Sequence, residues 1–191
     1  MPSQIPVITT CGKDGSPDPE EVERLYVAAF SSPPLFESPE FGDHNALLYG
    51  SLRHRPDLVV AAAWERGDLI GFAYGHRWLW KLQCDPWERQ LFDSLGHRAG
   101  EIEDSFAVYV RAVAPYRQRT GFGRRLLDSL LQTAGRQRAW LLTRDEATPA
   151  MALYVSGGWA PLGHGPDTSD GRPGVVLAWQ AATSRGRAVP G

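Results

Sequence analysis

The chain has 191 residues, of which 42% are hydrophobic and 22% are charged, and its formal net charge is −2. These values are ordinary for a globular protein, and the length suffices for one domain with a sizeable core. No apolar run approaches the roughly 20 residues of a membrane span, and the amino terminus lacks the basic start and apolar block of a secretion signal. We therefore expect a cytoplasmic protein without a membrane partner.

The cysteines and the charge distribution argue against a metal site and against a nucleic-acid partner. Cys11 and Cys84 do not have the spacing of a metal site, and we expect no metal. Residues 1–103 carry 16 acidic and 9 basic side chains, whereas residues 104–191 carry 6 acidic and 11 basic ones. An acidic half suits a cationic partner and a basic half suits an anionic one, although a scattered solvated surface gives the same count. No basic stripe is interleaved with aromatic residues, so we expect no nucleic-acid partner.

The first half predicts a strand, two helices and a hairpin. The ranges are a strand at 5–9, a loop at 12–19, a helix from 19 to about 30, a second helix at 41–53, and hairpin strands at 58–64 and 69–74. Asp18 is the expected N-cap of the first helix, with Pro19 at its first position. We expect a single domain over residues 1–180 and a disordered tail over residues 181–191, which are small, polar and contain Pro and Gly.

The segment between residues 75 and 100 allows two interpretations. Residues 76–80 continue the preceding strand, and residues 87–95 predict a short helix. Trp78, Trp80 and Trp87 either line a binding pocket or pack this segment against the sheet.

The most informative segment is a strand that turns through two glycines into a helix. Residues 106–113 (F-A-V-Y-V-R-A-V) have the composition of a strand, and Gly121 and Gly123 follow in a short turn. Phe122 and four leucines up to Leu131 then recur at helical spacing and predict a helix through residue 136. Such a turn exposes backbone N–H groups at the positive end of a helix dipole, and it typically binds phosphate. Four arginines add positive charge around it: Arg117, Arg119, Arg124 and Arg125.

Two motifs carry a resemblance to a known family. Residues 118–123 (Q-R-T-G-F-G) fit the pattern Q/R-x-x-G-x-G/A, three residues after Pro115. This resembles the acyl-CoA pyrophosphate loop of the GNAT superfamily of N-acetyltransferases, and it matches neither a Walker loop nor a dinucleotide fingerprint. Residues 150–159 (A-M-A-L-Y-V-S-G-G-W) are similar to the family's A-x-x-L-Y helix, and residues 140–143 supply the strand before it.

The resemblance implies a fold, a reaction and a set of site residues. The fold would be α/β, with a mixed, mostly antiparallel central sheet of six to seven strands flanked by helices. The reaction would be transfer of an acetyl group from acetyl-CoA to a primary amine by direct attack, without a covalent enzyme intermediate. Tyr154 would protonate the sulfur. The expected acetyl-CoA-binding residues are Val113, Gln118, Arg119, Thr120, Gly121, Phe122, Gly123 and Arg124.

The general base is left open. Family members often carry a glutamate at the positions of Ala107 or Tyr109, and neither is a carboxylate here. If no bulge intervenes, strand alternation places Glu103 in phase with both, and Glu103 would then act through a water molecule. Asp104 and His76 are the alternatives.

The acceptor is also open. The acidic first half favours a small cationic amine, and a protein amine is the alternative. The missing strand carboxylate favours a third interpretation, a non-catalytic acyl-CoA-binding module. The expected partners are therefore a small-molecule amine and, as an option, a second copy of the chain in a homodimer.

Overall fold

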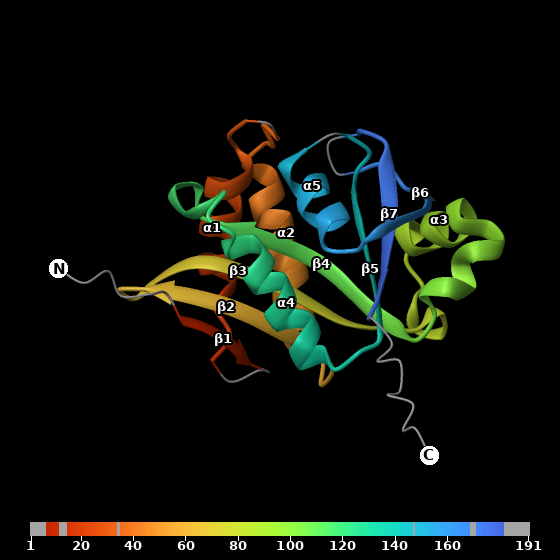
Figure 1. Ribbon diagram of the computed structural model, residues 1–191, viewed down its shortest axis with the longest axis horizontal. Coiled ribbons are helices and arrows are strands. Elements are labelled where there is room, and N and C mark those ends of the chain that lie inside the picture. The colour runs from red at the N-terminus through yellow and green to blue at the C-terminus, as the bar shows by residue number, and fades with distance from the viewer. Residues whose placement is uncertain (1–6, 12–14, 34, 147, 169–170, 182–191) are drawn as a thin grey trace, which may run out of the picture.

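A twisted sheet forms the centre of the protein. The computed structural model describes residues 7–11, 15–33, 35–146, 148–168 and 171–181. Within these residues seven strands lie in the order β1-β2-β3-β4-β5-β7-β6 (Figure 1), and all neighbouring pairs except β4–β5 are antiparallel. The strands are β1 (Val7–Cys11), β2 (Val59–Glu65), β3 (Asp68–Trp78), β4 (Ser105–Val113), β5 (Arg138–Arg144), β6 (Ala160–Gly165) and β7 (Gly174–Gln180). The predicted α/β fold with a mixed, mostly antiparallel sheet is confirmed.

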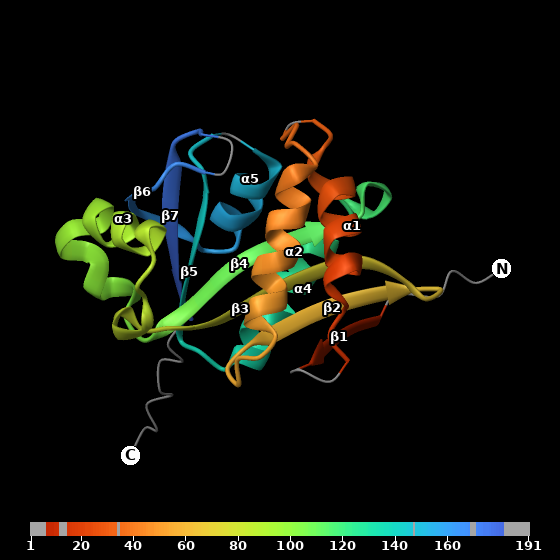
Figure 2. The same cartoon turned by 180° about the vertical axis from the view of Figure 1, so that it is seen from behind.

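Helices cover both faces of this sheet. Within the described ranges they are α1 (Pro19–Phe30), α2 (Glu40–Leu52), α3 (Pro86–Leu95), α4 (Phe122–Ala134) and α5 (Pro149–Ser156). Short 3-10 helices span Trp80–Leu82, Gly96–Ile102 and Pro115–Arg117. Helices α1 and α2 lie on one face and α4 on the other (Figure 1 and Figure 2). The described part of the chain contains no helix long and apolar enough to cross a bilayer.

The predicted element boundaries hold within a few residues. Helix α1 begins at Pro19, and the side chain of Glu21 accepts a hydrogen bond of 2.9 Å from the backbone N–H of Asp18. Strand β1 is shifted relative to the predicted strand at 5–9, whose first two residues lie outside the described ranges, as do residues 12–14 of the predicted loop. The predicted tail lies outside them too, from residue 182 onward.

Strands β4 and β5 open into a wedge. They are parallel and pair at two positions, where Phe106 and Ala107 lie opposite Ala139 and Trp140. Parallel strands require a crossover connection, and α4 supplies it. Because the pairing stops after Ala107, the strands separate toward the end of β4, at the side where α4 begins (Figure 1).

A β-bulge interrupts β4 at Tyr109. Tyr74 of β3 pairs with Val110, whereas the next residue, Gly75, pairs with Val108, so Tyr109 is the extra residue. The strands approach so closely here that a Cβ on Gly75 would lie 2.1 Å from the carbonyl oxygen of Ala107. The bulge breaks the inward–outward alternation. The prediction that Glu103 shares one strand face with Tyr109 required an unbroken strand, and it is therefore wrong.

The segment before β4 has its own small core. Trp78 is fully buried and makes edge contacts with Trp80 and Trp140, at ring-centroid distances of 5.2 and 4.8 Å. Leu91 of α3 is also fully buried in this cluster. Trp78 and Trp80 therefore pack the segment against the sheet, which was the second of the two interpretations of the sequence.

Candidate active site

The turn between β4 and α4 forms a cradle of backbone N–H groups. Gly121 is the N-cap of α4 and has a φ of 79°, a left-handed conformation that glycine adopts without strain. It provides no side-chain cap, so within the described residues the first N–H groups of this 13-residue helix have no capping side chain. Free N–H groups at the positive end of a helix dipole favour an anion. This geometry fits the predicted pyrophosphate loop.

Most of the predicted loop side chains hold the turn in place. The amide nitrogen of Gln118 donates to the Val113 carbonyl oxygen over 3.1 Å, and the hydroxyl of Thr120 donates to the Arg117 carbonyl oxygen over 2.7 Å. The guanidinium of Arg124 donates to the Leu153 carbonyl oxygen of α5 over 3.1 Å. Because these side chains are engaged within the protein, the loop can offer a ligand mainly its backbone groups.

The remaining loop residues take different positions. Phe122 and Val113 are buried in the main core. Arg119 is exposed and has a φ of 61°. A Cβ on Gly123 would lie 2.3 Å from Nη1 of Arg111, so a larger residue would collide with this guanidinium.

Arg111 connects the cradle with Tyr154. It extends from β4 between α4 and α5, and its guanidinium lies 5.5 Å from the centroid of the Tyr154 ring. Its Nε atom is buried without a hydrogen-bond partner, and no carboxylate among the described residues pairs with it. Tyr154 is 8% exposed, and within the described ranges its hydroxyl has no hydrogen-bond partner. The wedge therefore holds an uncompensated cation and an available hydroxyl donor.

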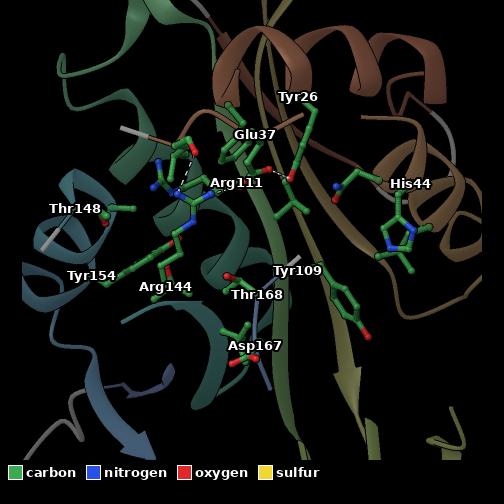
Figure 3. A pocket seen from close by; sticks show the side chains of 18 of the residues that line it. Tyr26, Glu37, His44, Tyr109, Arg111, Arg144, Thr148, Tyr154, Asp167 and Thr168 are labelled. Atoms are coloured by element: carbon green, nitrogen blue, oxygen red, sulfur yellow. Dashed lines mark hydrogen bonds and ion pairs between the residues drawn. The ribbon is translucent and has the colours of Figure 1, made fainter. Parts of the chain in front are cut away.

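A cavity of about 300 Å³ adjoins the wedge (Figure 3). Strands β4 and β5, helices α1, α2 and α5, and residues 167 and 168 contribute to its wall. Trp87 at the start of α3 also lines it, unlike the two other tryptophans of that segment. The polar and aromatic side chains labelled in Figure 3 are Tyr26, Glu37, His44, Tyr109, Arg111, Arg144, Thr148, Tyr154, Asp167 and Thr168. Tyr154 and Tyr109 lie on opposite sides of the cavity (Figure 3).

A buried ion pair anchors the loop between α1 and α2 at this cavity. Arg144 of β5 donates to Glu37 over 3.1 Å, and the two side chains are 6% and 10% exposed. The Tyr26 hydroxyl donates to the other carboxylate oxygen of Glu37 over 2.5 Å. Burial and the hydrogen bond to Glu37 raise the pKa of Tyr26 well above its usual range, so Tyr26 stays a donor. Glu37 was not among the sequence candidates, because it lies in a segment without periodic pattern.

The three candidate bases have different surroundings. Glu103 does not line the cavity, and its carboxylate accepts a hydrogen bond of 2.8 Å from the backbone N–H of Trp80. Asp104 forms ion pairs with Arg77 and Arg136. His76 is 1% exposed, and its Nε2 atom lies 3.0 Å from the hydroxyl of Tyr109. Of the three, His76 alone reaches the cavity wall, through Tyr109.

Fold and site together define an α/β protein with an anion cradle, a splayed strand pair and an adjoining cavity. The cradle and the cavity offer two neighbouring binding places, which suits a transferase with two substrates. The model of the acetyltransferase (GNAT) family matches residues 20–158. The chain therefore belongs to the GNAT acetyltransferase family. No curated protein matches the sequence significantly.

Solved structures share the fold. The ribosomal-protein-S18-alanine N-acetyltransferase from Escherichia coli aligns with a TM-score of 0.61 and 19% identity over 97% of this chain and 100% of its own. The aminoglycoside 6′-acetyltransferase type Ii aligns with a TM-score of 0.60 and 17% identity over 91% and 96%. The yncA structure from Salmonella typhimurium, with its cofactor acetyl-CoA, has a TM-score of 0.60 and 16% identity over 98% and 99%. At these identities the likeness shows the fold.

In the part of the chain that the structure describes, no group of three or more His, Cys, Asp or Glu side chains is arranged to hold a metal ion.

Proposed function

We propose that the protein transfers an acetyl group from acetyl-CoA to a primary amine of a small cationic molecule, by direct attack of the amine. The observation that carries this proposal is that one side chain, Arg111, links the backbone cradle with the cavity. Arg111 contacts the first turn of α4 at Gly123, lies over the ring of Tyr154 and lines the cavity. A ligand that enters from the cradle would thus meet a second molecule in the cavity beside Tyr154.

The residues of the wedge fit acetyl-CoA. The backbone N–H groups from Gly121 to Arg124 would hold the pyrophosphate, and Arg111, which no described carboxylate pairs, adds positive charge beside them. Acetyl-CoA supplies an activated thioester carbonyl. Tyr154 would donate its proton to the departing sulfur, because it lines the cavity and its hydroxyl has no partner within the described residues.

The size and surroundings of the cavity support a small cationic acceptor. A volume of about 300 Å³ lies at the lower end of the range of small-molecule sites. Burial, and after it the carboxylates of Glu88, Asp85 and Asp57, raise the pKa of the Tyr109 hydroxyl at the cavity wall, whereas Arg55 lowers it. The same negative charge would attract an ammonium group. Both a protein and an aminoglycoside acetyltransferase share this fold, so the fold leaves the acceptor open.

The test is release of free thiol from acetyl-CoA with a panel of amines. The panel contains polyamines, aminoglycosides, aromatic amines and peptides with a free amino terminus. We expect turnover with small cationic amines and none with the peptides. Turnover with peptides alone would favour a protein acceptor. Tight CoA binding without turnover on any member would favour the non-catalytic binding module and contradict the proposal.

A further inference from the structure

Tyr109 and His76 form a hydrogen-bonded pair that leads from the cavity into the sheet. Tyr109 lines the cavity, and its hydroxyl lies 3.0 Å from Nε2 of His76. Nδ1 of His76 lies 2.7 Å from the carbonyl oxygen of Arg77, which can only accept a hydrogen bond. Nδ1 therefore carries the proton, and Nε2 offers its lone pair to the Tyr109 hydroxyl. The Tyr109 oxygen keeps lone pairs that can accept from another donor.

The pair lies at the β-bulge of β4, where Tyr109 is the extra residue. His76 pairs in the β3–β4 register with Ala107, two residues before Tyr109. The extra residue re-aims the Tyr109 ring, which packs against the His76 ring at a centroid distance of 5.0 Å. On its other side Tyr109 stacks on Tyr74 at 6.1 Å.

The surroundings keep the imidazole neutral. Burial lowers the pKa of His76, so at neutral pH its Nε2 atom is available as a proton acceptor. Charged groups act on the pair from two places: Arg55 and Asp57 in the loop before β2, and Glu88 of α3 together with Asp85, the N-cap of that helix. Arg77 of β3 contributes only its carbonyl oxygen.

An attacking amine requires such an acceptor, because it is mostly protonated at neutral pH and must lose a proton before it attacks. Glu103 and Asp104 are engaged in contacts outside the cavity. Building on the proposed function, we propose that Tyr109 accepts the proton of the bound ammonium, directly or through one water molecule, and that His76 is the positioning residue behind it that takes up the proton released by Tyr109.

The proton transfers balance. One N–H bond of the ammonium breaks and its proton joins the Tyr109 oxygen, while the original hydroxyl proton moves to Nε2 of His76. The freed lone pair of the amine forms the bond to the acyl carbon. The electron pair of the C–S bond leaves with sulfur, which takes its proton from Tyr154. The nitrogen loses a second proton when the amide forms. In total it loses two, of which one replaces the proton of Tyr154 and the other passes from His76 to water.

The test compares Tyr109→Phe and His76→Gln with the wild-type protein, using acetyl-CoA and the best amine of the panel. Glutamine can accept from Tyr109 and donate to the Arg77 carbonyl, but it cannot take a proton. We expect each variant to lower kcat by about 100-fold near neutral pH, with CoA affinity unchanged. The loss should shrink as pH rises, because free amine then becomes abundant in solution. The double variant should lose little more than either single variant, because the two residues act in one path.

Tyr74→Phe is the matched control. Tyr74 is a fully buried tyrosine that stacks on Tyr109, and its hydroxyl has no partner within the described ranges. Its variant should keep wild-type kcat. A loss that is equal at every pH, or one that Tyr74→Phe shares, would show a packing role and overturn the proposal. Wild-type activity in both test variants would overturn it as well. A wild-type protein that releases no thiol with any amine would instead contradict the proposed function.

Nitrogen NMR of the imidazole gives a readout that does not depend on turnover. In the free protein we expect the proton of His76 on Nδ1 and a hydrogen-bonded Nε2. The Nε2 resonance should move toward that of an unbonded nitrogen in Tyr109→Phe. A proton on Nε2, or an Nε2 resonance that is the same in both proteins, would contradict the pair.

Discussion

At the scale of single residues, the proposed mechanism assigns the proton donor and the proton acceptor to two different tyrosines. Tyr154 and Tyr109 line the same cavity from opposite sides (Figure 3), but they have different partners. The Tyr109 hydroxyl already donates to His76, whereas the Tyr154 hydroxyl has no partner among the described residues. Two residues of one type could therefore serve opposite tasks, since the Tyr109 hydroxyl already donates its proton whereas the Tyr154 hydroxyl still has its proton to offer.

Tyr154→Phe tests the donor role. The ring and its contacts with Arg111 and Trp159 would persist, so CoA affinity should change little. Without the hydroxyl, kcat should fall roughly 10- to 100-fold, because the leaving thiolate is no longer protonated. Steady-state kinetics combined with calorimetric CoA binding separate the two quantities. An unchanged kcat would remove Tyr154 from the mechanism.

At the scale of elements, the start of α4 and the end of β5 position the site. Helix α4 presents its first turn at the wedge because Gly121 allows a left-handed turn directly before the helix. Strand β5 ends at Arg144, which reaches the loop between α1 and α2 through Glu37. One element thus supplies the anion cradle, and the other holds a wall of the cavity.

Gly121→Glu should abolish CoA binding. A side chain at a φ of 79° strains the turn, and a carboxylate placed at the cradle repels a pyrophosphate. Calorimetry with CoA measures the loss, and circular dichroism checks that the helices remain. Gly135→Glu at the other end of α4, where φ is 59°, carries a comparable strain and is the control. Wild-type CoA affinity in Gly121→Glu would refute the assignment of the cradle.

Arg144→Met should destabilise the protein by about 3–5 kcal/mol, because the Glu37 carboxylate would remain buried without its cation. Urea unfolding gives this difference. The exposed Arg172–Glu146 pair supplies the comparison, and Arg172→Met should cost at most about 1 kcal/mol. Equal effects of the two substitutions would show that the Arg144–Glu37 pair contributes no more than a surface ion pair.

At the scale of the whole molecule, sequence patterns predicted what depends on neighbours along the chain. Asp18 and Pro19 marked the start of α1, and the leucines after Gly123 marked α4. Long-range contacts were not predictable in this way. The bulge at Tyr109 lies in the pairing of β4 with β3, next to Gly75, and the Arg144–Glu37 pair joins residues 107 positions apart. The fold could thus be predicted from the sequence, whereas the polar contacts of the cavity could be identified only from the three-dimensional arrangement.

Global stability should depend on pH through His76. Its pKa is lower in the folded protein than in the unfolded chain, where it lies near 6.5. The unfolded state therefore binds more protons once pH falls below about 6.5, so the stabilising contribution is complete above that pH and is lost as pH decreases. Denaturant unfolding from about pH 5 to 8 measures how the free energy of unfolding changes with pH. This change should be smaller in His76→Gln than in the wild-type protein. An unchanged slope would show that His76 does not titrate between the two states.

The wedge also determines what kind of molecule can fill it. Beyond Phe106 and Ala107, the facing edges of β4 and β5 have backbone groups that no strand pairs within the described residues. In a complete sheet each edge would meet a neighbour at about 4.8 Å. An extended ligand with amide groups can take this place and act as a substitute strand, in the manner of β-augmentation. The pantetheine arm of CoA, a thin chain with two amides, has this form. Binding the cosubstrate would then complete the sheet as well as fill a cavity.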